Sequence, residues 1–113
     1  MSDHITLKAV EGTYSIRAAG AVLGETSNAV ELQENGYDPV IYVPRADLAM
    51  AFFDQTDHNT TCPHKGVATY FTIQAKSGPI PNAAWSYENP NEGLEKIAGH
   101  LAFYGNKVTI EAM

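Results

Sequence analysis

The chain has 113 residues, of which 44% are hydrophobic and 18% charged, and this composition predicts one globular domain spanning residues 1–113. Thirteen acidic and seven basic residues give a formal net charge of −6, which disfavours nucleic acid and anionic membrane surfaces as partners because both would be repelled. The single cysteine excludes an internal disulfide and a cysteine-rich zinc site.

The sequence has no long apolar run of the kind that export signals and membrane spans require. No stretch approaches the ~20 apolar residues that span a bilayer. The segment from Met1 to Lys8 has neither a basic start nor an apolar run, unlike a signal peptide. We therefore expect a cytoplasmic protein, a monomer or homodimer, with no membrane partner.

Short runs of β-favouring residues fill the first part of the chain. We expect strands at residues 14–18, 21–24, 29–33 and 40–43, separated by Gly20 and by the polar segment 26–28. Asn35-Gly36 predicts a tight turn, because both residue types tolerate positive φ. Pro44 ends the fourth strand, since it donates no ladder hydrogen bond.

The second part begins with apolar residues at helical spacing, which predict a two-turn helix over residues 47–53. Residues 54–66 are polar and are expected to form a loop. Strands follow at 67–75 and 83–87, then a second short helix, 92–99, capped by Asn91, and a closing hairpin of 101–104 with 108–111. The predicted fold class is mainly β, with minor α: a single compact domain of bent antiparallel sheets with two short helices.

The loop from Thr60 to Gly66 concentrates reactive side chains. Cys62, His64 and Lys65 are the candidate catalytic residues, because neighbouring cations lower the pKa of a thiol and favour the nucleophilic thiolate. Lys65 is three positions after Cys62, so an extended chain would place the two side chains on opposite faces. The alternative is a tight connection in which the cysteine is a small buried hydrophobe.

A metal site is a further alternative for the same segment. His58, Cys62 and His64 would supply three nitrogen and sulfur ligands, whereas structural zinc usually takes four. We therefore expect no metal and no cofactor.

Aromatic and cationic residues elsewhere predict a ligand pocket. Aromatic side chains would form its walls, with Arg45 or Lys65 engaging an anionic group. The alternatives are that the aromatic residues pack the core and that Arg45 pairs with Asp47 or with the rim rich in Glu and Asp. The candidate ligand-binding residues are Tyr42, Arg45, Thr60, Cys62, Lys65, Tyr70, Trp85 and Tyr87.

Several motifs together resemble the bacterial family called domain of unknown function 427. The resemblance runs from about Tyr14 to Ile110. Its motifs are Gly20-Ala-Val-Leu-Gly-Glu-Thr26, Val40-Ile-Tyr-Val-Pro-Arg-Ala-Asp47, Thr60-Thr-Cys-Pro-His-Lys-Gly66 with Ala68 and Tyr70, Ala84-Trp-Ser-Tyr87, and Ile97-x-Gly-His100 with Phe103-Tyr104.

The resemblance implies a compact, mainly β fold of the β-tent kind, an architecture shared by zinc-containing domains and by small-ligand binders with aromatic cages. This chain lacks the paired Cys-x-x-Cys elements that hold zinc in such relatives. A nucleotidyltransferase label also circulates for the family, but the chain lacks the carboxylate cluster of two-metal phosphoryl transfer. Many members have tyrosine in place of His64, which leaves Cys62, Lys65 and Gly66 as the matching core.

The leading functional hypothesis is a small-molecule-binding module with a cleft near the Thr60 to Gly66 loop. In it, Arg45, Cys62 and Lys65 share one rim, and the aromatic residues form the walls. The first alternative is an enzyme that uses Cys62 as nucleophile or redox thiol. The second is a structural or interaction protein whose motif residues only hold the fold.

Overall fold

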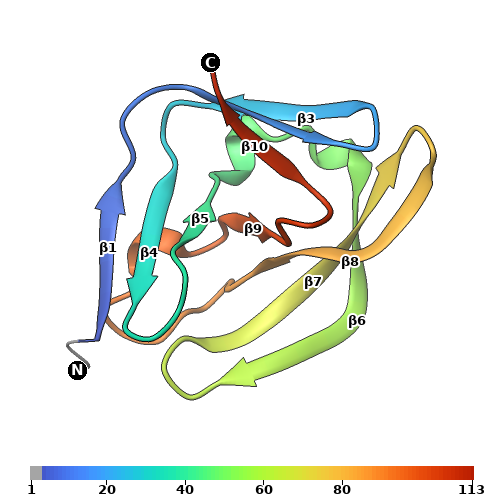
Figure 1. The fold of residues 1–113 in the computed structure, drawn as a ribbon. Coiled ribbons are helices and arrows are strands. Elements are labelled where there is room, and N and C mark those ends of the chain that lie inside the picture. The colour runs from blue at the N-terminus through green and yellow to red at the C-terminus, as the bar shows by residue number, and fades with distance from the viewer. Residues whose placement is uncertain (1–3) are drawn as a thin grey trace.

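The computed structural model describes residues 4–113, which form ten strands and three short 3-10 helices (Figure 1). The 3-10 helices are η1 (Arg45–Asp47), η2 (Met50–Phe52) and η3 (Glu95–Ile97). The strands are β1 (Ile5–Ala9), β2 (Tyr14–Ala18), β3 (Ala21–Thr26), β4 (Val30–Glu34), β5 (Val40–Tyr42), β6 (Phe53–Cys62), β7 (Gly66–Ala75), β8 (Gly78–Ser86), β9 (Leu101–Phe103) and β10 (Thr109–Ala112).

The strands form three antiparallel sheets, in the orders β1-β4-β5, β10-β2-β3 and β6-β7-β8-β9. The first and third sheets meet at β5 and β9. There Val43 and Leu101 exchange two backbone hydrogen bonds of 2.8 Å. This junction sets β4 and β5 against β8 and β9, with β6 and β7 continuing outward (Figure 1).

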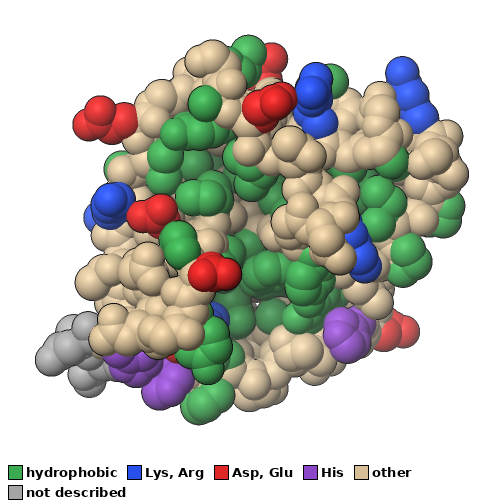
Figure 2. Space-filling view, viewed as in Figure 1, with side chains coloured by type: hydrophobic (Ala, Val, Ile, Leu, Met, Phe, Trp, Pro, Cys, Tyr) green, Lys and Arg blue, Asp and Glu red, His purple; other side chains and the backbone are tan. Residues whose placement is uncertain are grey.

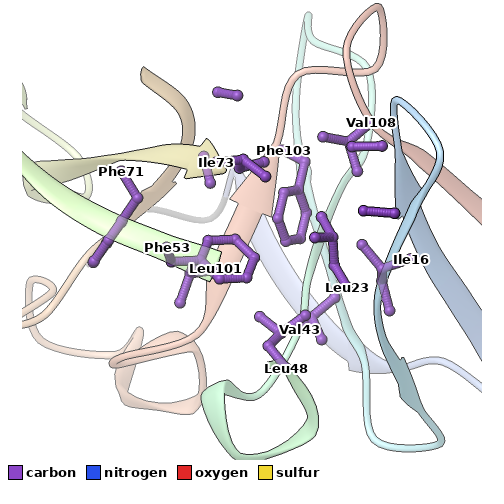
Figure 3. Packing of buried hydrophobic residues seen from close by; sticks show 14 residues of the cluster. Ile16, Leu23, Val43, Leu48, Phe53, Phe71, Ile73, Leu101, Phe103 and Val108 are labelled. Carbon is purple, nitrogen blue, oxygen red and sulfur yellow. The ribbon is translucent and has the colours of Figure 1, made fainter. Parts of the chain in front are cut away.

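Two hydrophobic clusters stabilise the arrangement. The larger lies between the second and third sheets, where Ile16 and Leu23 pack near Phe103 and Val108 (Figure 3). The smaller lies between the first and third sheets and is rich in aromatic residues. Its fully or nearly buried members are Leu32, Tyr42, Ala68, Tyr70, Tyr87, Leu94, Ile97 and Ala102.

The mainly β prediction is confirmed, and strand 14–18 has the predicted bounds. The predicted loop 54–66 is wrong for most of its length, because residues 53–62 form β6. This strand lies at the edge of its sheet, and only Phe53 in it is buried, so its polar composition reflects exposure on both faces.

Both predicted helices are wrong in type. Residues 47–53 contain parts of two single 3-10 turns, and 92–99 contains one. Asn91 does not cap a helix with its side chain; its Nδ2 donates instead to the carbonyl oxygen of Pro63. The closing hairpin is also wrong, because β9 pairs with β8 whereas β10 pairs with β2.

Among the described residues, no helix is long and apolar enough to cross a membrane. Residues 1–3 belong to the segment on which the cytoplasmic prediction was based, and they lie outside the described residues.

Candidate functional site

The turn between β6 and β7 presents the reactive residues. The backbone N–H of Lys65 donates to the carbonyl oxygen of Cys62 at 3.2 Å, and Gly66 has φ of +114°, which favours glycine. Asn91 holds this turn from the opposite segment, through its side-chain bond to Pro63 and a 2.9 Å backbone bond to Lys65. Backbone and side-chain hydrogen bonds therefore hold the turn at Cys62, Pro63 and Lys65.

Beside this turn lies a pocket of about 510 Å³, between β4 and β5 on one side and β7 and β8 on the other. Hydrophobic side chains line the hollow in the middle of the face drawn in Figure 2. The pocket is lined by Leu32, Glu34, Tyr37, Asp38, Val40, Tyr42, Cys62, Pro63, His64, Lys65, Tyr70, Trp85, Tyr87 and Tyr104.

Trp85 stands at the centre of the aromatic wall. Its ring centroid lies 4.8 Å from that of Tyr104 and 6.4 Å from that of Tyr70. Its indole Nε1 donates to the hydroxyl of Tyr42 at 3.3 Å, which fixes the ring plane. On the far side, Tyr42 and Tyr87 lie 6.5 Å apart between centroids.

The surroundings raise the pKa of three tyrosine hydroxyls in the pocket wall. Burial raises the pKa of Tyr42 to about 12 and also raises the pKa of Tyr87. A side-chain hydrogen bond with Tyr70, followed by burial, raises the pKa of Tyr104 to about 12. At neutral pH Tyr42, Tyr87 and Tyr104 therefore offer neutral hydroxyls and apolar ring faces.

The charged residues of the pocket leave a small negative excess. Nζ of Lys65 donates to Oε1 of Glu34 at 2.9 Å, and these side chains are only 16% and 11% exposed. Asp38 adds a second carboxylate to the lining. Because Glu34 already pairs with the ammonium of Lys65, no unpaired lysine or arginine lines the pocket among residues 4–113.

A second hollow, of about 590 Å³, adjoins the pocket. The two share Asp38, Val40, Trp85 and Tyr104 as lining residues. Beyond this common wall, the second hollow is lined by apolar residues such as Phe103 and Val108.

Most of the residues singled out from sequence come together here. Cys62 and Lys65 line the same pocket. An extended chain would point their side chains to opposite faces, but the backbone turns tightly between the two residues. His64 lines it as well. The predicted aromatic residues that line it are Tyr42, Tyr70, Trp85 and Tyr87.

Arg45 does not line the pocket, contrary to the expected shared rim. Its Nη2 donates to Glu88, its Nε donates to the carbonyl oxygen of Gly99 at 3.1 Å, and its guanidinium lies 5.5 Å from the ring centre of Phe71. Its partner is also not Asp47, which accepts from Thr26. Arg45 therefore ties η1 to the segment after β8.

Thr60 acts on the pocket through another residue. Its Oγ1 lies 3.1 Å from the hydroxyl of Tyr70, but it is not among the lining residues. It therefore positions a wall residue from outside.

Sequence reasoning missed several lining residues, above all Glu34 and Asp38. Glu34 directly precedes the Asn35-Gly36 turn and is 8% exposed, which is unusual for a carboxylate. The sequence held a signal for Glu34, because it lies on the same face of β4 as the buried Leu32. A glutamate on a buried face needs a cationic partner. Its partner, Lys65, is far away in sequence and could not be read from it.

The histidines are arranged differently from the metal alternative considered above. The ring of His58 packs on Tyr70, with centroids 4.5 Å apart. Within residues 4–113, the only group of three potential metal ligands comprises His4, Glu34 and His64, whose ligand atoms lie within 4.8 Å of one another. The trio His58, Cys62 and His64 does not gather.

Comparison with known proteins gives a family but no activity. A family model described as "Domain of unknown function (DUF427)" matches residues 6–113. No curated protein matches the chain.

Proposed function

The chain belongs to the DUF427 family, and we propose that it binds a small molecule in the aromatic pocket beside the β6–β7 turn. The observation that carries the proposal is the convergence of Trp85, three buried tyrosines and the exposed Tyr104 on one pocket of about 510 Å³. Pockets for small ligands typically measure roughly 300–1,000 Å³ and combine apolar walls with a few polar groups.

The charges of the pocket indicate the class of ligand. Lys65 is neutralised by Glu34, and Asp38 contributes a further negative charge. Aromatic faces attract cations and stack on planar rings. We therefore propose a planar ligand that is neutral or cationic. The sequence predicted an anionic ligand because it placed Arg45 at the rim of the pocket.

The adjoining hollow supports a ligand longer than one ring. Trp85 and Tyr104 line both cavities. A ring stacked on Trp85 would leave an apolar substituent in contact with Phe103 and Val108.

The test uses the fluorescence of Trp85, the only tryptophan. The probes are N-methylpyridinium derivatives, neutral nitrogen heterocycles and planar aromatic carboxylates. We expect saturable quenching by probes of the first two classes, with Kd below about 1 mM, and none by the carboxylates. Absence of saturable quenching by all three classes would contradict the proposal.

A pair of tyrosine variants locates the binding. Tyr104→Ala removes an exposed wall residue and should weaken binding of the quenching probe at least about tenfold, a loss of roughly 1.4 kcal/mol. Tyr14→Ala is the matched control, because Tyr14 bonds the carbonyl oxygen of Glu11 and does not line the pocket. Equal loss in both variants would place the probe elsewhere.

A catalytic role for Cys62 has one supporting observation, that the half-buried thiol lines the same pocket. The adjacent candidate base, His64, packs edge-on against His4 instead, with ring centroids 4.4 Å apart. Alkylation by iodoacetamide separates the hypotheses. A pocket cysteine is protected by the quenching probe, whereas a catalytic thiolate also reacts faster than free cysteine at neutral pH.

We propose that the protein acts in the cytoplasm as a monomer or homodimer. The negative formal charge of −6 supports the absence of a nucleic-acid partner.

A further inference from the structure

We propose that His4, Glu34 and His64 bind one divalent transition-metal ion of the zinc type at the rim of the aromatic pocket. These residues come from three separate parts of the chain. His4 directly precedes β1, Glu34 ends β4, and His64 lies in the turn between β6 and β7. The inference is independent of the pocket's organic ligand.

The fold itself holds the three residues together. Antiparallel pairing places Ile5 opposite Glu34, and the backbone N–H of Asn35 donates to the carbonyl oxygen of His4 at 2.9 Å. The ion pair of Glu34 with Lys65 brings the β6–β7 turn to the same point. Histidine atoms gather at the lower left of Figure 2, where Figure 1 shows the start of β1 and the end of β4.

The distances suit a shared ion after small side-chain rotations. Nε2 of His4 lies 3.7 Å from Oε2 of Glu34, and the three ligand atoms lie within 4.8 Å of one another. Ligands of a tetrahedral zinc ion, each about 2.0–2.1 Å from the metal, lie roughly 3.3 Å apart. His64 is exposed, so its ring has room to turn toward the ion.

Lys65 orients the carboxylate of Glu34 toward the proposed metal position. The ammonium holds Oε1 of Glu34, whereas Oε2 faces His4. A ligating carboxylate oriented by an outer hydrogen bond is the usual arrangement in metal sites. The positive charge of Lys65 opposes the metal, so we expect an affinity on the order of micromolar, below that of four-ligand structural sites.

Two imidazoles and one carboxylate form the donor set of an open zinc site. Glu34 and His64 also line the aromatic pocket, so the remaining coordination position lies near it. Water or a donor atom of a pocket ligand would fill that position.

The test is calorimetric titration of Zn²⁺ into chelator-treated protein without a polyhistidine tag. We expect one equivalent to bind, and His4→Ala, His64→Ala and Glu34→Gln each to weaken binding at least about tenfold. Co²⁺ should give visible absorption bands of a low-coordinate site that His64→Ala abolishes. His64 is exposed, so His64→Ala should retain the wild-type melting temperature.

The other two histidines provide the controls. His58 packs on Tyr70, and Nδ1 of His100 lies 3.2 Å from the carbonyl oxygen of Ala98. His58→Ala and His100→Ala should leave Zn²⁺ affinity unchanged. No binding at 100 μM, on the order of a hundred times the expected Kd, or equal weakening by all four histidine variants would overturn the proposal. Tyr104→Ala, which tests the organic ligand, should not alter Zn²⁺ binding.

Discussion

Nζ of Lys65 lies 2.9 Å from Oε1 of Glu34, across 31 residues of sequence, and both side chains are largely buried. This ion pair joins the first sheet to the β6–β7 turn at the edge of the aromatic pocket. The same carboxylate takes part in the proposed metal site through its other oxygen. The pair therefore connects the stability of the fold with both proposed sites.

Lys65→Met should destabilise the protein because it leaves the carboxylate of Glu34 buried without its cation. Loss of one partner of a fully buried pair costs about 3–5 kcal/mol, and the residual exposure here reduces the expected loss to about 2 kcal/mol. Urea denaturation measures the change in unfolding free energy.

The control for this variant is Lys8→Met. Lys8 pairs with Glu31 at 3.7 Å, but its side chain is 75% exposed, so the expected loss is under about 0.5 kcal/mol. Equal losses of unfolding free energy in Lys65→Met and Lys8→Met would show that burial does not strengthen the Lys65–Glu34 pair.

Gly24→Ala should be destabilising because β3 lies directly against the segment after η1. A Cβ atom on Gly24 would lie 2.2 Å from the carbonyl oxygen of Asp47 and 3.1 Å from Cα of Leu48. Both atoms belong to backbone, so relief requires separating the two segments, at about 2–3 kcal/mol. Thermal and urea denaturation measure it.

Gly105→Ala is the matched control, since nothing lies within 4 Å of its added Cβ and its φ is not positive. We expect a change within about 0.5 kcal/mol. A Gly24→Ala protein as stable as this control would contradict the close approach of the two segments.

Alternation between core and solvent predicted β2, where Ile16 and Ala18 are buried and Arg17 is exposed. No strand was predicted at β1, although Ile5 and Leu7 are less exposed there than Thr6 and Lys8. The sequence pattern failed for β6, because an edge strand with two exposed faces does not alternate. The helical spacing of apolar residues over 47–53 also misled the prediction, because this segment forms separate 3-10 turns, η1 and η2, and not one helix.

The candidate site was predictable in part for a similar reason. Cys62 and Lys65 stood out by residue type, and the local turn brought them together. The placement of Arg45 depended on Glu88, 43 residues away, and that of His4 depended on the pairing of β1 with β4. Such contacts follow from tertiary structure, which a single sequence does not reveal.

Stability should fall as pH rises from 10 to 12. Burial raises the pKa of Tyr42 from 10.0 in the unfolded chain to about 12, so the folded state retains a proton that the unfolded state loses. The slope of unfolding free energy against pH is therefore negative in this window, and flat with respect to Tyr42 below it. Urea denaturation at successive pH values measures the slope.

Tyr42→Phe removes this contribution and should make the alkaline loss shallower without abolishing it, because burial also raises the pKa of Tyr87. The control is Tyr37→Phe, whose side chain is 69% exposed and should leave the slope unchanged. An unaltered slope in Tyr42→Phe would contradict the burial of this phenol.

Arg45→Ala should lower stability by about 1 kcal/mol and leave probe affinity unchanged, because Arg45 ties segments together outside the pocket. Arg17→Ala is the control. It removes a pair with Glu111 in which both side chains are more than half exposed, so the loss should be smaller. A large fall in probe affinity in folded Arg45→Ala protein would place Arg45 at the site after all.

The most direct test of the aromatic pocket is the indole N–H resonance of Trp85, a single signal because the chain has one tryptophan. This N–H donates to Tyr42 inside the pocket wall, so an occupant alters its environment. We predict that titration of the quenching probe into ¹⁵N-labelled protein shifts this resonance saturably, together with backbone resonances of Cys62 and Lys65. A saturable shift of other resonances with the indole signal unmoved would contradict the account.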